Sequence, residues 1–160
     1  MHRILRALVV GSLFAVVGGN LAFAAGAADP VVGTWNLNLA KSTFTPGPAP
    51  KSATRTYATT ANGIALTYSQ VNADGTTASG ASTFKLDGKD YAITGSPDYD
   101  ALSLRRLNGS TIRSQQKMKG KAVGTTMRTV SAGGRVLTLD STRTDVKGMK
   151  HHDIQVFDKQ

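Results

Sequence analysis

The chain has 160 residues, a length typical of one domain, and a formal net charge of +9 at pH 7. It contains no cysteine, which excludes disulfide bonds and a lipid anchor attached through cysteine. All ten acidic residues are aspartate, so no glutamate is present to act as an acid with a raised pKa.

Residues 1–24 have the pattern of a secretory signal peptide. A basic start, MHRILR, precedes the apolar stretch ALVVGSLFAVVGGNLAFA, which ends in the small-x-small cleavage pattern Ala22-Phe23-Ala24; cleavage after Ala27 is the alternative. Glycines interrupt this stretch, whereas a membrane-spanning helix needs about 18 or more continuous apolar residues. We therefore expect an exported protein, periplasmic or extracellular, with a mature domain over residues 28–160 and no transmembrane segment in it.

The first predicted strand covers residues 31–38 and contains Gly33 and the only tryptophan, Trp35. The next segment, residues 39–52, contains three prolines. Because proline lacks an amide donor and disfavours the turn before it, no full helix can form there. A single helical turn over residues 39–44 is the most that we expect.

From residue 53 onward, tight turns divide the chain into short segments. Asn-Gly and Asp-Gly pairs at residues 62, 74, 87 and 108 tolerate the positive φ of type I′ hairpin turns. Together with Ser96-Pro97-Asp98, Lys119-Gly120, Gly133-Gly134 and Lys147-Gly148, such turn signals recur about every 10 to 14 residues. Between them, segments such as IALTYSQV and RVLTLDST alternate apolar and polar residues, which is the period of a strand with one buried face. The expected strands cover residues 31–38, 53–61, 64–72, 77–86, 89–95, 101–107, 110–118, 121–131, 135–145 and 150–158.

Strands joined in sequence by tight hairpins are antiparallel neighbours, so these ten form a meander. A long meander with one apolar face tends to close, because closure removes its exposed edges. We predict an all-β, up-and-down antiparallel barrel of about ten strands, closed or nearly closed. A β-sandwich is the second choice, since it needs long crossovers and only residues 39–52 supply one.

The run VGTWNLNLAKSTF resembles the first strand of the calycin group, which comprises the lipocalins and the intracellular fatty-acid-binding proteins. The resemblance is strongest to small exported bacterial proteins called lipocalin-like and spans nearly the whole mature chain. It implies a ten-stranded barrel whose floor is formed by Gly33 and Trp35. It rests on the opening GTWxLNxAKSxFxPGPxPKS and on Asp87, Gly88, Lys89, Tyr91, Thr94, Gly95, Pro97 and Asp98.

Two features of fatty-acid-binding proteins have no counterpart in this sequence. Their Arg-x-Tyr pair, which grips a carboxylate, is matched by Gln155-Val156-Phe157, and a neutral glutamine cannot form a charge-assisted pair with a carboxylate. A proline-rich run stands where that family has its helix-turn-helix lid. We therefore do not expect the fatty-acid contact of that family here.

Alternation also predicts which side chains point into the barrel. Arg106 and Arg143 lie at even spacing from Leu104 and Leu139, so alternation places both arginines on the inward face. An inward arginine is costly unless it is paired, so both indicate an anionic ligand or a buried polar partner such as Tyr57 or Tyr68. The alternative places both arginines at the rim, in water. We predict Tyr57, Tyr68, Arg106 and Arg143 as ligand-binding residues. The expected apolar inward set is Leu37, Leu66, Tyr68, Phe84, Tyr91, Ile93, Leu102, Leu104, Leu139 and Ile154.

The pattern gives little support to a catalytic, metal or cofactor site. His151 and His152 are too few for zinc, which needs three or four ligands. Asp98 and Asp100 could serve as paired carboxylates in glycoside chemistry, but aspartates in a proline-bearing turn are more commonly turn residues. We expect a monomeric, non-catalytic protein without metal or cofactor that binds a small, at least partly apolar molecule in its lumen.

Residues 101–160 carry twelve basic and four acidic residues. This basic half is either a solvated barrel wall or a face that docks on an anionic envelope component or on a partner. Such docking is the alternative function. Nucleic acid is not an expected partner, because the few aromatic residues offer no stacking platform.

Overall fold

The computed structural model describes residues 28–160. The predicted signal peptide, residues 1–24, and the alternative cleavage after Ala27 concern residues outside this range. Within the described range, no helix has the length and apolar character needed to span a membrane.

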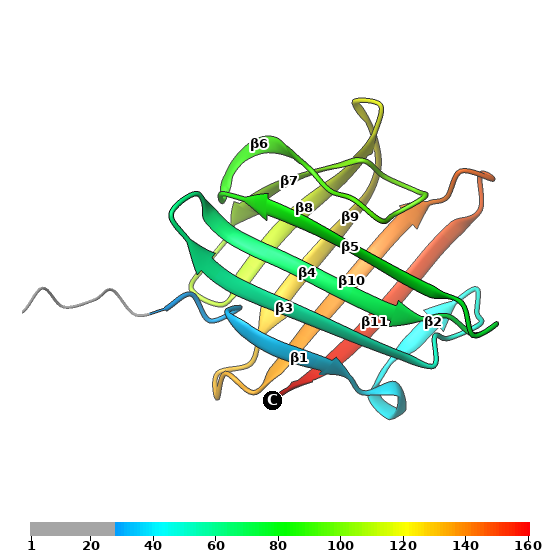
Figure 1. The fold of residues 1–160 in the computed structure, drawn as a ribbon, viewed down its shortest axis with the longest axis horizontal. Helices are drawn as coiled ribbons and strands as arrows, with labels where there is room; N and C mark the ends of the chain where they lie inside the picture. The colour runs from blue at the N-terminus through cyan, green and yellow to red at the C-terminus, as the bar shows by residue number, and fades with distance from the viewer. Residues whose placement is uncertain (1–27) are drawn as a thin grey trace, which may run out of the picture.

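The described chain consists almost entirely of antiparallel strands (Figure 1). One short 3-10 helix, η1, follows the first strand. In chain order the elements are β1 (Gly33–Leu37), η1 (Leu39–Lys41), β2 (Thr43–Thr45), β3 (Ser52–Thr60), β4 (Gly63–Val71), β5 (Thr77–Phe84), β6 (Asp87–Ala92), β7 (Ala101–Arg106), β8 (Thr111–Met118), β9 (Lys121–Val130), β10 (Val136–Thr144) and β11 (Lys150–Lys159).

The strands curve into a barrel in which sequence neighbours are mostly spatial neighbours (Figure 1). The wall has ten strands in the order β5-β4-β3-β1-β11-β10-β9-β8-β7-β6, and β2 lies off this path. This arrangement confirms the predicted all-β, antiparallel, nearly closed barrel of ten strands. The expected strand ends agree with those of the wall strands to within three residues.

The first wall strand is interrupted near its middle. β1 pairs with residues 157–159 and β2 with residues 152–154, so both lie along β11. Between them η1 forms the expected single turn, in which the Lys41 amide donates to the Asn38 side-chain oxygen at 3.2 Å. The interruption leads the chain into its proline-rich segment before β3 begins.

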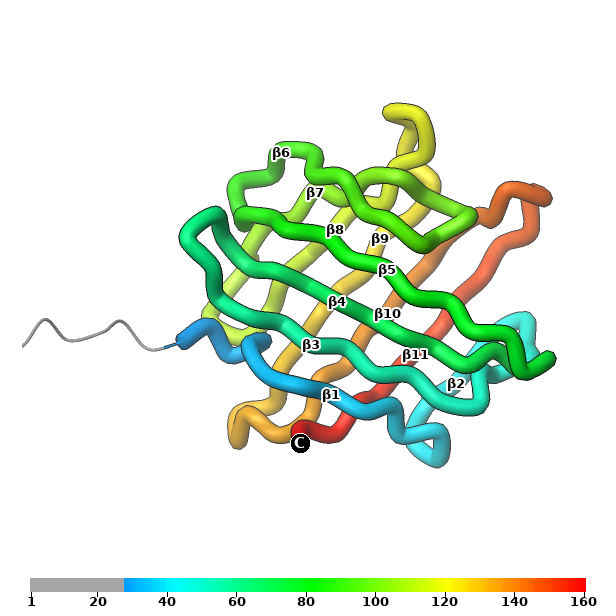
Figure 2. Tube along the Cα trace, in the orientation of Figure 1, coloured from blue at the N-terminus to red at the C-terminus, as the bar shows by residue number. Residues whose placement is uncertain are grey.

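The barrel closes between β5 and β6, the two ends of the sheet path. A single bridge, between Ser82 and Ile93, joins them. The backbones approach closely at Gly95, where an added Cβ would lie 1.9 Å from the Ser79 carbonyl oxygen and φ is +81°. Glycine is therefore needed at this contact. Within the described residues no ladder of paired residues joins β5 to β6, so the barrel is nearly closed rather than fully closed (Figure 2).

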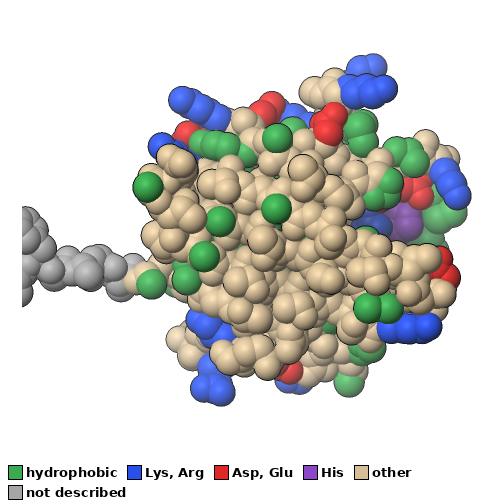
Figure 3. Space-filling view, viewed as in Figure 1, with side chains coloured by type: hydrophobic (Ala, Val, Ile, Leu, Met, Phe, Trp, Pro, Cys, Tyr) green, Lys and Arg blue, Asp and Glu red, His purple; other side chains and the backbone are tan. Residues whose placement is uncertain are grey.

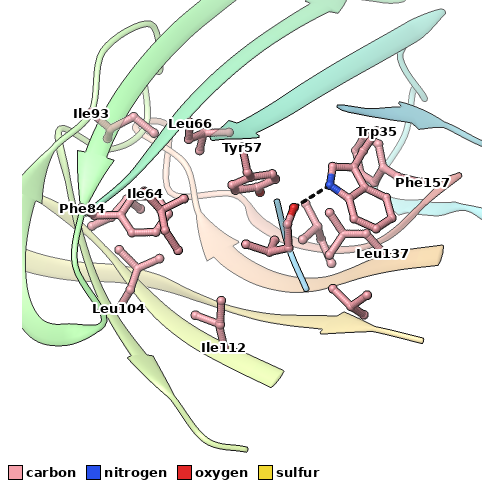
Figure 4. Close-up of a cluster of buried hydrophobic side chains, with 14 residues drawn as sticks. Trp35, Tyr57, Ile64, Leu66, Phe84, Ile93, Leu104, Ile112, Leu137 and Phe157 are labelled. Carbon is pink, nitrogen blue, oxygen red and sulfur yellow. Dashed lines mark hydrogen bonds between the residues drawn. The ribbon is translucent and has the colours of Figure 1, made fainter. Parts of the chain in front are cut away.

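Most buried hydrophobic side chains lie toward one end of the barrel, which we call the closed end. The β3–β4, β7–β8 and β9–β10 turns lie at this end. Tyrosine, phenylalanine and tryptophan each contribute large buried side chains here (Figure 4). The core comprises Val31, Trp35, Tyr57, Ile64, Leu66, Phe84, Ile93, Leu102, Leu104, Ile112, Val130, Leu137, Leu139 and Phe157.

Trp35 is 0% exposed and lies at the closed end. Its indole Nε1 donates to the Val31 carbonyl oxygen at 2.8 Å, which ties the segment before β1 across the core (Figure 4). The Lys159 ammonium lies 5.0 Å from the centroid of the Trp35 ring. Gly33 leaves room for that lysine, since an added Cβ would lie 2.5 Å from Lys159 Cε, and its φ is +138°.

The expected inward set agrees with the structure except at Ile154. The other nine side chains are buried or pack against the core. In β11 the inward phase belongs to Asp153, Gln155 and Phe157, while Ile154 stands opposite Asp140, which is exposed. The prediction for Ile154 is wrong because polar side chains occupy the inward positions of β11 that alternation would give to apolar ones.

Candidate functional site

A cavity of about 540 Å³ occupies the barrel beyond the core, toward its other end. We call this the open end; its mouth is surrounded by the proline-rich segment, the β4–β5 turn and the loop of residues 93–100. Pro46, Pro48 and Pro50 line the mouth. The cavity therefore lies inside the wall and opens between loops rather than between strands.

Arg55, on β3, lines the cavity, and residues 28–160 provide no acceptor for its N–H groups. Its guanidinium carbon lies 5.5 Å from the ring centroid of Tyr68 and 5.7 Å from that of Phe157. Among residues 28–160 its side chain has no carboxylate partner and no hydrogen-bond acceptor, and its Nε is buried. Two aromatic faces thus hold a guanidinium whose five donors need solvent or a ligand.

Arg128, on β9, is a second arginine in the lumen and is only 5% exposed. Its Nη1 donates to the Ser114 hydroxyl at 2.6 Å, while its Nε is buried without a partner. Within the described part of the chain no carboxylate pairs with it. A buried charge of this kind is usually paired with an opposite charge. Because residues 28–160 provide no carboxylate for Arg128, the position favours an anionic ligand.

The cavity has a polar wall and an apolar wall. On the polar wall, formed by β8, β9 and β10, the Gln116 amide donates to the Thr126 hydroxyl, which lies 2.8 Å from the Ser141 hydroxyl. The Gln116 Oε1 atom is buried there without a donor among the described residues. The surface from β4, β5 and the residue after β6 is lined by Leu66, Tyr68, Ala78 and Ile93, and Leu102 on β7 adds an apolar side chain beside Gln116. Such a cavity suits a molecule with one polar and one apolar part.

Tyr68 links the apolar wall to the loop at the mouth. Its hydroxyl donates to the Thr94 carbonyl oxygen at 3.0 Å. Burial raises the pKa of Tyr68, the nearby Tyr99 adds to this, and the Arg55 charge opposes it. The phenol therefore stays protonated at neutral pH and acts as a donor.

Arg143, on β10, differs from the two other arginines because it is paired. It donates to Asp153 at 2.7 Å and to Asp98 at 3.4 Å. Burial lowers the pKa of Arg143, but the hydrogen bonds and charges of Asp153 and Asp98 outweigh it, so the net pKa is raised. Arg143 thus joins β11 and the 93–100 loop at the mouth and has its charge balanced by the protein.

The structure brings together two of the four predicted ligand-binding residues. Tyr68 and Arg143 line the cavity. Tyr57 lies in the core of the closed end, with its hydroxyl buried and without a partner among residues 28–160. Arg106 lies near the β7–β8 turn, where it pairs with Asp29 and donates to the backbone carbonyls of the turn. Neither of these two lines the cavity.

Sequence reasoning missed Arg55 and Arg128, the two arginines of the lumen for which residues 28–160 provide no carboxylate. The signal was available for both, because alternation places Arg55 in phase with Tyr57 and Arg128 in phase with the buried Val130. The outward-facing positions of these strands are rich in threonine. With polar residues on both faces, the sequence pattern does not distinguish the inward arginines from residues on a solvated surface.

The side chains considered for metal or glycoside chemistry are engaged in local contacts. His151 lies 3.1 Å from Asp145, and His152, on the outer face, lies 2.9 Å from Asp140. Asp98 contacts Arg143 as described, and Asp100 accepts a hydrogen bond from a backbone amide of the β8–β9 turn.

The comparisons with known proteins yield distant structural similarities. No protein-family model matches the sequence, and no curated protein matches it. A zebrafish ileal bile acid-binding protein complexed with cholic acid is similar at 11% identity, with 82% of this chain and 99% of that chain covered and a TM-score of 0.49. The siderocalin Ex-FABP is similar at 10% identity, with 82% and 74% covered and a TM-score of 0.39.

At these identities and TM-scores, the two similarities carry no argument about a ligand or an activity. The fold assignment rests on this chain's own topology, a nearly closed, ten-stranded, up-and-down barrel with an internal cavity.

Proposed function

We propose that this protein binds a small molecule with an anionic group and an apolar body in the lumen of its barrel, without catalysing a reaction. The observation that carries the proposal is Arg55, a cavity-lining arginine for which residues 28–160 provide no acceptor. Arg128 supports it, since it is nearly fully buried and lacks a carboxylate partner in the same part of the chain. The apolar wall would cover the rest of the ligand.

The energetics favour an anion over a neutral ligand at this place. An ionised group that loses water without gaining a partner is strongly destabilised, whereas a hydrogen bond to a charged group contributes about 1.5–3 kcal/mol. A carboxylate, sulfonate or phosphate beside Arg55 or Arg128 would therefore gain affinity from a charge that the folded chain already holds. Arg143 would add less, because two aspartates already neutralise it.

A pair of dyes that differ only in one charged group tests the proposal. 8-Anilinonaphthalene-1-sulfonate and N-phenyl-1-naphthylamine share the same ring system, and only the first carries a sulfonate. We expect Arg55→Met and Arg128→Met each to weaken binding of the sulfonate about 10- to 150-fold, the equivalent of 1.5–3 kcal/mol, and to leave binding of the neutral dye nearly unchanged. Fluorescence titration measures both.

The matched control is Arg113→Met, the same substitution at an exposed position of β8. It should change neither dissociation constant. If the lumen variants weakened both dyes equally, or neither, the arginines would not select an anion and the proposal would be wrong.

We also propose that the protein acts outside the cytoplasm as a monomer. The support for export is the basic and apolar pattern of residues 1–24 with its small-x-small ending. Mass spectrometry of the protein recovered from an exporting host should find an N-terminus at residue 25 or 28. An intact N-terminus would contradict export.

The alternative function is docking through the basic second half of the chain. The number of unpaired basic side chains on its surface is smaller than the sequence suggests. Of the twelve basic residues in residues 101–160, Arg128 and Arg143 line the lumen. Arg106 and Lys117 form ion pairs with Asp29 and Asp90. Docking through the whole wall is therefore the weaker candidate, and of the eight remaining basic residues Lys119, Arg135 and Lys147 lie in turns.

A further inference from the structure

Two neighbouring turns at the open end carry exposed apolar and basic side chains. One is the β10–β11 turn, residues 145–149, taken together with the first residue of β11, Lys150. The other is the β8–β9 turn, residues 119–120, taken together with the first residue of β9, Lys121. Four large hydrophobic side chains are exposed among residues 28–160, and two of them, Val146 at 65% and Met149 at 49%, lie in the β10–β11 turn. A single exposed hydrophobic side chain needs no explanation, but two in one short turn form a patch.

Lysines surround this apolar pair. Lys147 and Lys150 belong to the same turn, and Lys119 and Lys121 belong to the neighbouring one; all four are exposed, and none has a carboxylate partner within residues 28–160. β9 pairs with β10, so the two turns leave adjacent strands. The space-filling view shows basic side chains standing out at both tips, at the top and at the right of the molecule (Figure 3).

The carboxylate within the β10–β11 turn, that of Asp145, is directed inward, whereas Asp100 beside Lys119 is exposed. Asp145 accepts from the backbone amides of Lys147 at 2.9 Å and Met149 at 2.8 Å, and lies 3.1 Å from His151. These hydrogen bonds, first of all the one with His151, hold the pKa of Asp145 below its usual value. The aspartate shapes the turn, and the lysine side chains remain free to face a partner.

Both turns are fastened beside the cavity mouth by the loop of residues 93–100. Asp100 accepts from the Lys119 amide at 3.0 Å, and Asp98 accepts from the Val146 amide at 3.5 Å while pairing with Arg143. This is the aspartate pair in the PDYDA segment for which the sequence left glycoside chemistry open. Its two members hold one turn each, so both turns are attached to the loop that borders the opening, and we call the two turns together the rim.

We propose that this rim, consisting of Val146, Met149, Lys119, Lys121, Lys147 and Lys150, docks on an anionic lipid bilayer with the cavity mouth toward the membrane. Exposed apolar side chains flanked by lysines match the interface, where apolar groups enter the acyl boundary and ammonium groups meet anionic headgroups. Each lysine near such a surface contributes roughly fivefold in affinity. An acidic protein would attract the lysines but gives no reason for Val146 and Met149 to be exposed. This inference does not depend on what the lumen binds.

The absence of cysteine allows a direct test with a single introduced label. Met149→Cys and Arg135→Cys each receive an environment-sensitive nitrobenzoxadiazole dye; the second position is exposed in the β9–β10 turn at the closed end. With vesicles of 30% phosphatidylglycerol in phosphatidylcholine, we expect a blue shift and quenching by brominated acyl chains at position 149 and neither at position 135. Equal signals at the two positions would overturn the orientation.

Vesicle sedimentation with charge-matched double variants tests the patch itself. The complete chain is expressed for every protein, so the N-terminal segment contributes equally to all. Lys147→Glu/Lys150→Glu should lower binding to the anionic vesicles at least 20-fold, and the control Arg113→Glu/Arg135→Glu, with the same change in net charge, less than threefold. Equal losses would mean that overall charge, and not the rim, drives binding.

A second variant guards against a loss of folding. Val146→Ser/Met149→Ser keeps the lysines and should still weaken binding to anionic vesicles about tenfold or more. Its binding to heparin, a polyanion without an apolar phase, should not change. If vesicle binding were unaffected by this variant, or if the wild type bound heparin but not the vesicles, the lipid proposal would be refuted. Neutral-dye binding to the lumen reports separately on whether each variant is folded.

Discussion

Replacing Arg128 with methionine should stabilise the unliganded protein although it weakens anion binding. The guanidinium is 5% exposed, has one hydrogen bond to Ser114 and leaves its buried Nε without a partner. Methionine has a similar length, is apolar and adapts to irregular space. The substitution therefore removes a desolvated charge and places an apolar side chain against Leu139, which stands opposite Arg128 in β10.

The magnitude follows from two opposing terms. Replacing buried ionic groups with apolar side chains of similar volume stabilises proteins by about 1–4 kcal/mol, and here no carboxylate in residues 28–160 is left behind unpaired. The lost hydrogen bond to Ser114 subtracts about 1 kcal/mol, because that hydroxyl keeps a weaker contact with the Thr126 carbonyl at 3.5 Å. We expect a net gain of about 1–3 kcal/mol, which raises the Tm by roughly 4–10 °C in a domain of this size.

Urea unfolding, followed by the fluorescence of the single tryptophan, measures the free energy in the absence of ligand. Adding the sulfonate dye should reverse the order, because a ligand that binds only the folded state stabilises it in proportion to occupancy. The reasoning is refuted if Arg128→Met is destabilised without ligand by more than 1 kcal/mol, since the guanidinium would then be part of the structural core.

Three further outcomes follow from the structure. Arg143→Met should destabilise by about 1–3 kcal/mol in the same urea assay, the opposite sign to Arg128→Met, because it leaves two partly buried carboxylates unpaired; a stabilised variant would contradict this. Gly33→Ala should cost about 1–3 kcal/mol, since φ is +138° and the methyl group would meet a lysine side chain, whereas Gly109→Ala, with nothing within 4 Å, should be nearly neutral; equal effects would refute the argument. The folded-state pKa of Asp145 lies below its unfolded value, so the stabilisation from the carboxylate is present above the unfolded pKa, near 3.9, and is lost as the pH falls through the folded one. The Tm deficit of Asp145→Asn should therefore shrink as the pH falls below 4, and a deficit that persists at pH 2 would contradict this sign.

The barrel was predictable because its information is local. Asn62-Gly63 and Asp87-Gly88 each mark the start of a strand, and alternation between such turns defines one buried face. The pattern could not reveal β2, since three residues are too few for a period to register. Ile154 was misassigned for a related reason, because alternation assumes that the apolar residue points inward and the lumen of this barrel is partly polar.

The site was less predictable because alternation does not show which inward arginine has a carboxylate partner. Arg143 lines the cavity, and its two carboxylate partners are Asp153 on the neighbouring strand β11 and Asp98, which lies 45 residues away in the sequence. Arg106 likewise pairs with Asp29, 77 residues away, at the closed end. Only the folded chain distinguishes these paired arginines from Arg55 and Arg128, for which residues 28–160 provide no carboxylate, so the sequence indicated the residue type and only some members of the site.

The division of the barrel into two halves accounts for how it can hold charges without partners. The closed end contains most of the buried hydrophobic side chains, including Trp35 and Phe157, and a core of this kind provides the main stabilisation of the domain. The unpaired arginines of the other half can then cost a few kcal/mol of the free energy of unfolding without preventing folding. Arg55 lies where the halves meet, with the Phe157 ring on one side and the cavity on the other. The aromatic ring of the core orients the Arg55 guanidinium, and the lumen side chains among residues 28–160 offer it no acceptor. A preformed anion site requires this arrangement.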